Sequence, residues 1–187
     1  MSILTPIPDA EAVGETAAIF ADERESLGYV PIHTKVLARN PAASRAWESL
    51  TGAIVRSMGL RRYELVTLAA AKALGSDACR LAHGKKSLGC FDEDQLVRIA
   101  ANYRDADLSD AEVAAMDFAT RLSGTSSTMT EADAQRLRDV GFDDAEIVDI
   151  ALAAGARNYF SRVLHALAID VDVPPGLSPE LEAALRT

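Results

Sequence analysis

A helical segment with almost no polar face constrains this chain more than any other feature. After Glu64, the residues up to Gly75 are apolar or alanine almost all round, apart from Thr67 and Lys72. A helix that is apolar on every side is buried in a core or an interface. Glu64 stands near the start of this helix, so the pattern indicates a candidate buried carboxylate. Such a group is costly unless it is paired or protonated.

Capping and breaking residues divide the rest of the chain into further helices. Asn40-Pro41 is a typical helix start, because Asn caps well and Pro suits the first turn. No stretch shows a strongly alternating strand pattern. The expected helices span about residues 9–21, 41–59, 61–74, 76–88, 92–102, 110–122, 130–140 and 143–170, with a short turn after Ser178-Pro179. The sequence therefore predicts an all-α fold, a single-domain bundle of roughly seven to nine helices.

The bulk composition excludes several classes of function. The 187 residues, 49% of them hydrophobic, fit one domain with an N-terminal arm over residues 1–30. The net charge of −9 disfavours a role on nucleic acid or anionic membrane, since both need clustered Lys and Arg. No apolar run reaches the ~20 residues of a membrane span, and we expect no signal peptide. Two cysteines make no disulfide framework, so a cytoplasmic, reduced setting is expected.

The candidate catalytic residues cluster between Ser76 and His83. Ser76 is a good N-cap, which places Cys79 at the third helical position, one turn before His83 on the same face. The helix N-terminus favours an anion, and a protonated His83 would add a positive partner. Cys79 is thus a candidate nucleophile, His83 a candidate general base and Glu64 a candidate to orient the imidazole. The alternative is that Cys79 is a small buried hydrophobe.

Two other uses of these residues are weaker. Cys90 would lie about 16 Å from Cys79 if the segment stays helical, whereas a disulfide needs Cα atoms within about 7 Å. Cys79, His83 and Glu64 could be zinc ligands, but a C-x3-H pair with one distant Glu is not a strong zinc pattern. We therefore expect no metal site and no cofactor.

The spacing of four residues resembles a known motif. Glu64, Ser76, Cys79 and His83 form E-x11-S-x2-C-x3-H. This resembles E-x11-C-x2-C-x3-H, the core motif of the alkylhydroperoxidase D-like members of the carboxymuconolactone decarboxylase family. The surrounding run LGSDACRLAHGKKSLG is also similar to the family's usual sequence.

A second stretch resembles one branch of that family. Residues 129–170 are similar to the C-terminal half of its "uncharacterized peroxidase-related" members, most recognisably in the run RNYFSR that starts at Arg157. The resemblance covers roughly residues 31–171, which implies an alkylhydroperoxidase D-like helical domain there and a tail over 172–187. It also implies a homo-oligomer (a dimer, trimer or hexamer) with the reactive site near a subunit interface.

The chain departs from the motif at one position. In the dithiol members, two cysteines reduce peroxide and cycle through a disulfide, while Glu and His move protons. Ser76 stands where the first cysteine should be, so that disulfide cannot form, although its hydroxyl could donate a hydrogen bond to a Cys79 thiolate. The resemblance then implies an antioxidant, peroxiredoxin-like oxidoreductase with one thiol. A hydroperoxide oxidises Cys79 to sulfenic acid, His83 and Glu64 relay the proton, and an external thiol restores the cysteine.

Two other functions remain open on the same scaffold. A decarboxylase or isomerase acting on another small-molecule substrate would use Glu64 and His83 but not Cys79. A non-catalytic oligomeric protein would need none of the three.

Overall fold

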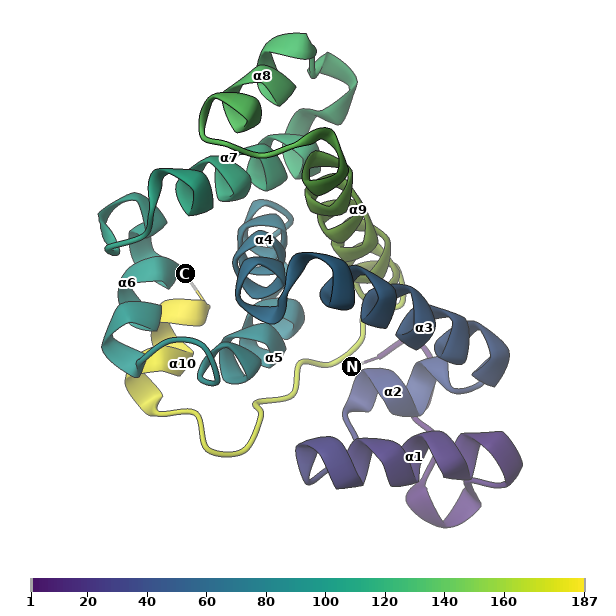
Figure 1. The fold of residues 1–187 in the computed structure, drawn as a ribbon. Helices are drawn as coiled ribbons and strands as arrows, with labels where there is room; N and C mark the ends of the chain where they lie inside the picture. Colours follow the sequence, from purple (N-terminus) through teal and green to yellow (C-terminus); the bar gives the residue numbers. More distant parts are fainter. Residues whose placement is uncertain (1, 187) are drawn as a thin grey trace.

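The computed structural model describes residues 2–186, which form ten α-helices and three short 3-10 helices with no strand (Figure 1). Within that range, no helix combines the length and apolar composition that a membrane span needs. The α-helices are α1 (Gly14–Leu27), α2 (Ile32–Leu37), α3 (Pro41–Met58), α4 (Leu60–Ala73), α5 (Asp77–Ser87), α6 (Glu93–Asn102), α7 (Asp110–Thr125), α8 (Glu131–Asp139), α9 (Asp144–Ala166) and α10 (Pro179–Leu185).

The all-α prediction is confirmed, with one helix more than the upper estimate. The additional helix is α2, which is only six residues long and contains Thr34 and Val36, two β-branched residues that do not favour helix. Tertiary contacts hold it instead, because both side chains are buried and Asp172 accepts a hydrogen bond from the Ile32 backbone amide. No local sequence signal reports those contacts.

Helix α4 is the centre of the bundle, as its apolar sequence predicts. All residues from Tyr63 to Ala71 are buried. Helices α3, α5, α7 and α9 pack around it, so the central part of α4 has no face left for solvent (Figure 1). Burying this part of the helix on all sides fixes the positions of the helices that surround it.

Two neighbours of α4 carry the polar groups described below. A tight turn at Gly75, whose φ is +62°, sends the chain from α4 directly into α5. Helix α9 starts at a capping box. The Asp143 side chain accepts a hydrogen bond from the Glu146 backbone amide, and the Glu146 side chain accepts one from the Asp143 backbone amide. Its inner face then runs past both α4 and the start of α5. The polar groups of α5 and α9 therefore meet next to the second turn of α4.

The last helix packs against α5 and α6 at the edge of the bundle. Gly84 of α5 lies directly under Leu185 of α10, which is 1% exposed, and a Cβ at Gly84 would overlap the methyl groups of that leucine. This glycine is needed for close approach, since its backbone is ordinary helix.

We predict that Gly84→Ala lowers the free energy of unfolding by about 1–3 kcal/mol, because overpacking against Leu185 outweighs the gain in helix propensity of about 1 kcal/mol. The matched control is Gly124→Ala in α7, where no atom lies within 4 Å of the added Cβ. That variant should be neutral or more stable by up to about 1 kcal/mol in urea denaturation. Equal effects of the two alanines would contradict the packing argument.

Candidate functional site

The thiol of Cys79 lies in the first turn of α5 and is almost completely buried, at 2% exposure. Ser76 is the N-cap residue, as expected, and Cys79 follows at the third helical position. The hydrogen bond that Ser76 could donate to the thiol does not form, however. The buried Ser76 hydroxyl has no hydrogen-bond partner among residues 2–186, and its side chain does not cap the helix either.

Glu64 and His83 form a buried pair. The carboxylate of Glu64, at 1% exposure, accepts a hydrogen bond from His83 Nδ1 across a distance of 2.7 Å. Glu64 comes from the second turn of α4 and His83 from the second turn of α5, and the turn at Gly75 brings the two helices side by side. The buried carboxylate that the sequence of α4 predicts is therefore present, and His83 is its partner in the core.

Arg157 of α9 joins this pair to the thiol. Its Nη2 lies 2.6 Å from His83 Nε2, and its Nη1 donates to Cys79 Sγ across 3.4 Å. One turn further along α9, the Ser161 hydroxyl also donates to Cys79 Sγ, across 3.3 Å. No direct hydrogen bond between Cys79 and His83 occurs in the described part of the chain. Arg157 and Ser161 therefore take the places that the sequence analysis gave to His83 and Ser76.

Arg157 was not selected as a site residue from the sequence, although a signal was present. Arg157 and Ser161 are polar residues, four apart, on a buried face of α9 that otherwise consists of apolar residues such as Ile150, Ala154 and Leu164. An arginine on such a face has to be paired.

His83 is neutral, so it does not add the positive charge that a protonated imidazole would bring to the thiol. Burial, with the positive charge of Arg157, lowers the pKa of His83 to about 4, against the smaller opposing effect of Glu64. A guanidinium can only donate, so His83 Nε2 accepts from Arg157 and the proton sits on Nδ1, facing Glu64. The positive charge next to the thiol is therefore that of Arg157.

The sulfur of Cys79 is the acceptor in this arrangement. Sγ accepts two hydrogen bonds, one of them from a fixed cation, and it lies at the positive end of α5. Arg157 has one further donor, Nε, which is buried and has no hydrogen-bond partner among the described residues. Arg157 thus binds the sulfur through Nη1 and keeps Nε without a partner among residues 2–186.

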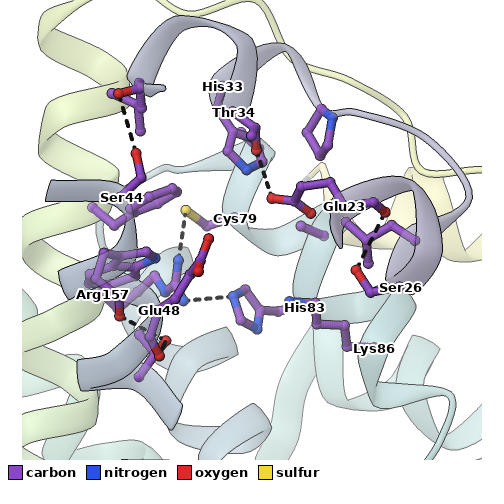
Figure 2. A pocket seen from close by; sticks show the side chains of 18 of the residues that line it. Glu23, Ser26, His33, Thr34, Ser44, Glu48, Cys79, His83, Lys86 and Arg157 are labelled. Atoms are coloured by element: carbon purple, nitrogen blue, oxygen red, sulfur yellow. Dashed lines mark hydrogen bonds between the residues drawn. The ribbon is translucent and has the colours of Figure 1, made fainter. Parts of the chain in front are cut away.

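A cavity of about 930 Å³ leads to these groups (Figure 2). This is near the upper end of the range of about 300–1,000 Å³ that is typical of ligand pockets. Aromatic rings form one wall: Trp47 of α3 stacks on Phe160 of α9 with centroids 4.7 Å apart, and Tyr159 lies beside them. Arg157 lies against both stacked rings, which hold its guanidinium in place.

The second cysteine and the metal possibility do not belong to this site. Both cysteines are free thiols, and Cys90 is not among the residues that line the cavity. Between residues 2 and 186, no group of three or more His, Cys, Asp and Glu side chains is placed to hold a metal ion. Cys79, His83 and Glu64 are instead connected through Arg157.

Two histidines that line the cavity make stability depend on pH. Burial lowers the pKa of His33, which lines the cavity, to about 3, and that of His83 to about 4. Unfolding lets both bind protons between those values and about 6.5, so the free energy of unfolding falls as pH decreases through that window. Each contributes at most about 1.4 kcal/mol per pH unit.

We predict that His83→Gln removes its share of this slope between about pH 6.5 and 4. The wild-type protein is the reference for this comparison. Urea denaturation at a series of pH values measures both. A wild-type slope in the His83 variant would show that the imidazole is not held neutral.

No protein-family model and no curated protein matches this chain. Solved structures do match. An uncharacterized peroxidase-related protein from Ralstonia eutropha JMP134, described as an alkylhydroperoxidase AhpD core, is 24% identical with a TM-score of 0.80, covering 100% of this chain and 97% of the other. The debrominase Bmp8, in complex with 2,3,4-tribromopyrrole, shares the fold at 16% identity and a TM-score of 0.79, over 99% and 98% of the two chains.

A peroxidase-related protein from Silicibacter sp. TM1040 is more similar in sequence. It is 28% identical with a TM-score of 0.77, over 91% of this chain and 88% of its own. The fold, these neighbours and the spacing of Glu64, Cys79 and His83 agree with one another. The chain shares the fold of alkylhydroperoxidase AhpD-core and peroxidase-related proteins, and these neighbours match the branch that its motif resembles.

Proposed function

We propose that the protein is a thiol-dependent peroxidase that reduces hydroperoxides through Cys79 alone. The observation that carries this proposal is the pair of hydrogen bonds that Cys79 Sγ accepts from Arg157 and Ser161 at the base of the cavity. A thiolate, not a thiol, is the nucleophile toward peroxide, and a fixed cation favours the thiolate. The peroxidase-related neighbours are consistent with this chemistry.

The reaction follows from the groups at the site. Cys79 thiolate attacks one oxygen of the hydroperoxide, the O–O bond breaks, and the products are the sulfenic acid and an alkoxide that takes up a proton. In this proposal the buried Arg157 Nε–H, which has no partner among residues 2–186, binds the departing oxygen after the side chain has shifted. Two equivalents of an external thiol then return Cys79 to the thiol, releasing water and a disulfide.

In this proposal, Glu64 and His83 position Arg157 before they act as a proton relay. In the structure, His83 Nε2 is occupied by Arg157, so the imidazole holds the guanidinium in place. Glu64 fixes the tautomer that makes this possible. Their role as a proton relay remains part of the proposal, and it requires Nε2 to exchange Arg157 for the departing oxygen.

A second candidate substrate is a halogenated aromatic ring. The cavity is much larger than hydrogen peroxide requires, and stacked aromatic side chains line one wall. The structural neighbour bound to 2,3,4-tribromopyrrole is a debrominase. Release of bromide from a brominated pyrrole, with thiol as reductant, tests this candidate against peroxide consumption.

The expected homo-oligomer also stays a proposal. Helix α9 exposes Val148, Leu152 and Tyr159 on one face, each about half exposed, with Leu50 of α3 also exposed. Apolar side chains gathered in this way are typical of interfaces. We propose this face as the contact between copies of the chain, which the molar mass in solution tests.

We predict that Cys79→Ser abolishes peroxide consumption, whereas Cys90→Ser retains the wild-type rate. A dimedone-type probe should label Cys79 after one equivalent of peroxide, detected by peptide mass spectrometry. Undiminished consumption in the Cys79 variant would disprove the proposal. Turnover of another small acid in that variant would instead support the decarboxylase or isomerase alternative.

We predict that Arg157→Gln slows peroxide reduction by about 10- to 100-fold, the loss expected for a hydrogen bond from a charged donor. Alkylation of Cys79 by iodoacetamide at pH 7 should slow as well, because less thiolate is present. The control is Arg162→Gln, at an exposed position of the same helix. An Arg157 variant that folds and is alkylated at the wild-type rate would remove Arg157 from the mechanism.

A further inference from the structure

The cavity has a second polar group, away from the thiol. Glu23 of α1 lines it, and Thr34 of α2 donates a hydrogen bond to Glu23 Oε1 across 2.8 Å. Figure 2 shows this pair on the other side of the cavity from Arg157. Burial raises the pKa of Glu23, against smaller opposing effects of Thr34 and Lys86. A half-buried carboxylate on a cavity wall is costly to keep unless a ligand uses it.

The carboxylate of Glu23 has capacity for another donor. Its Oε2 has no hydrogen-bond partner and no ion pair within the described part of the chain. The neighbouring acids of the rim are already occupied, because Asp22 and Glu48 both form ion pairs with Arg45. Glu23 is therefore the acid of this wall that can accept from a bound molecule.

The thiol chemistry proposed above needs a second sulfur, which the chain does not supply. Ser76 replaces the partner cysteine, and Cys79 is the one cysteine among the cavity-lining residues. The Cys79 sulfur lies at the base of the cavity and is 2% exposed. A small thiol can enter the cavity to reach this sulfur, whereas a thiol on a folded protein would need an extended segment to do so.

We propose that the external thiol is a small aminothiol, whose ammonium group is held by Glu23 and Thr34 while its sulfur reaches Cys79. The inference rests on the proposed peroxidase function. The net charge of −9 favours a cationic reductant over an anionic one. The Cys79 sulfenic acid and one aminothiol give a mixed disulfide and water. A second aminothiol attacks that disulfide, releases the symmetrical disulfide and returns Cys79 to the thiol.

The same mixed disulfide can be formed by thiol–disulfide exchange without peroxide, so this test does not depend on peroxidase activity. Reduced protein is mixed with cystamine, with the neutral 2-hydroxyethyl disulfide or with the anionic 3,3′-dithiodipropionate. The thiolate of Cys79 displaces one half of each reagent, and intact mass gives the rate. Comparing Glu23→Gln with the wild type for each reagent cancels the reagent's own reactivity.

The expected result is a loss of selectivity. Glu23→Gln should slow the reaction with cystamine by about fivefold or more, and change the rate with the neutral reagent by less than twofold. Glu25→Gln, an exposed acid on the same helix, should behave as the wild type with all three reagents. When the corresponding thiols reduce sulfenylated protein, Glu23→Gln should again slow the aminothiol more than the neutral or the anionic thiol.

Two results would overturn the proposal. One is an equal effect of Glu23→Gln on all three reagents. The other is faster reduction of the sulfenylated protein by a small dithiol protein of the thioredoxin type than by any small thiol. Failure to form the sulfenic acid at all would instead refute the peroxidase function, while cystamine selectivity would still report whether Glu23 binds an ammonium group.

Discussion

A buried guanidinium is the interaction on which the rest of this structure depends. Arg157 is 3% exposed, in a bundle whose central helix is apolar almost all round. An arginine cannot lose its charge in a protein, so it must be balanced where it lies. Glu64 supplies the balancing negative charge through neutral His83, and a Cys79 thiolate would supply a second. The packing of α4, α5 and α9 is what brings these four side chains together.

Local sequence signals predicted the elements of the fold well. Three kinds of signal act over only a few residues: the apolar character of α4, the Asn40 and Asp143 caps, and the glycine after α4. The corresponding helices lie where these signals predict them. Helix α2 was missed because its stability comes from Asp172, far away in the sequence. Helix propensity describes only local sequence, and tertiary contacts such as this one can outweigh it.

The site was predictable in part for the same reason. Glu64, Cys79 and His83 lie within twenty residues, so their spacing was visible. Arg157 is 74 residues from His83, and one sequence gives no indication of which distant residue closes such a set. Ser76 shows the opposite error, because its position at the helix start was right but its hydroxyl has no hydrogen-bond partner within residues 2–186. Knowing where a side chain starts does not tell where its polar atom points.

The origin of the activating groups has a consequence for the life of the protein. The sulfur is carried by α5, but the cation and the hydroxyl that bind it both belong to α9, more than seventy residues later. A chain still leaving the ribosome, or one whose α9 has detached, carries a sulfur without these two donors. Its susceptibility to oxidants is then that of any unstructured cysteine. The environment of the sulfur is in this way completed only when α9 has packed against α5.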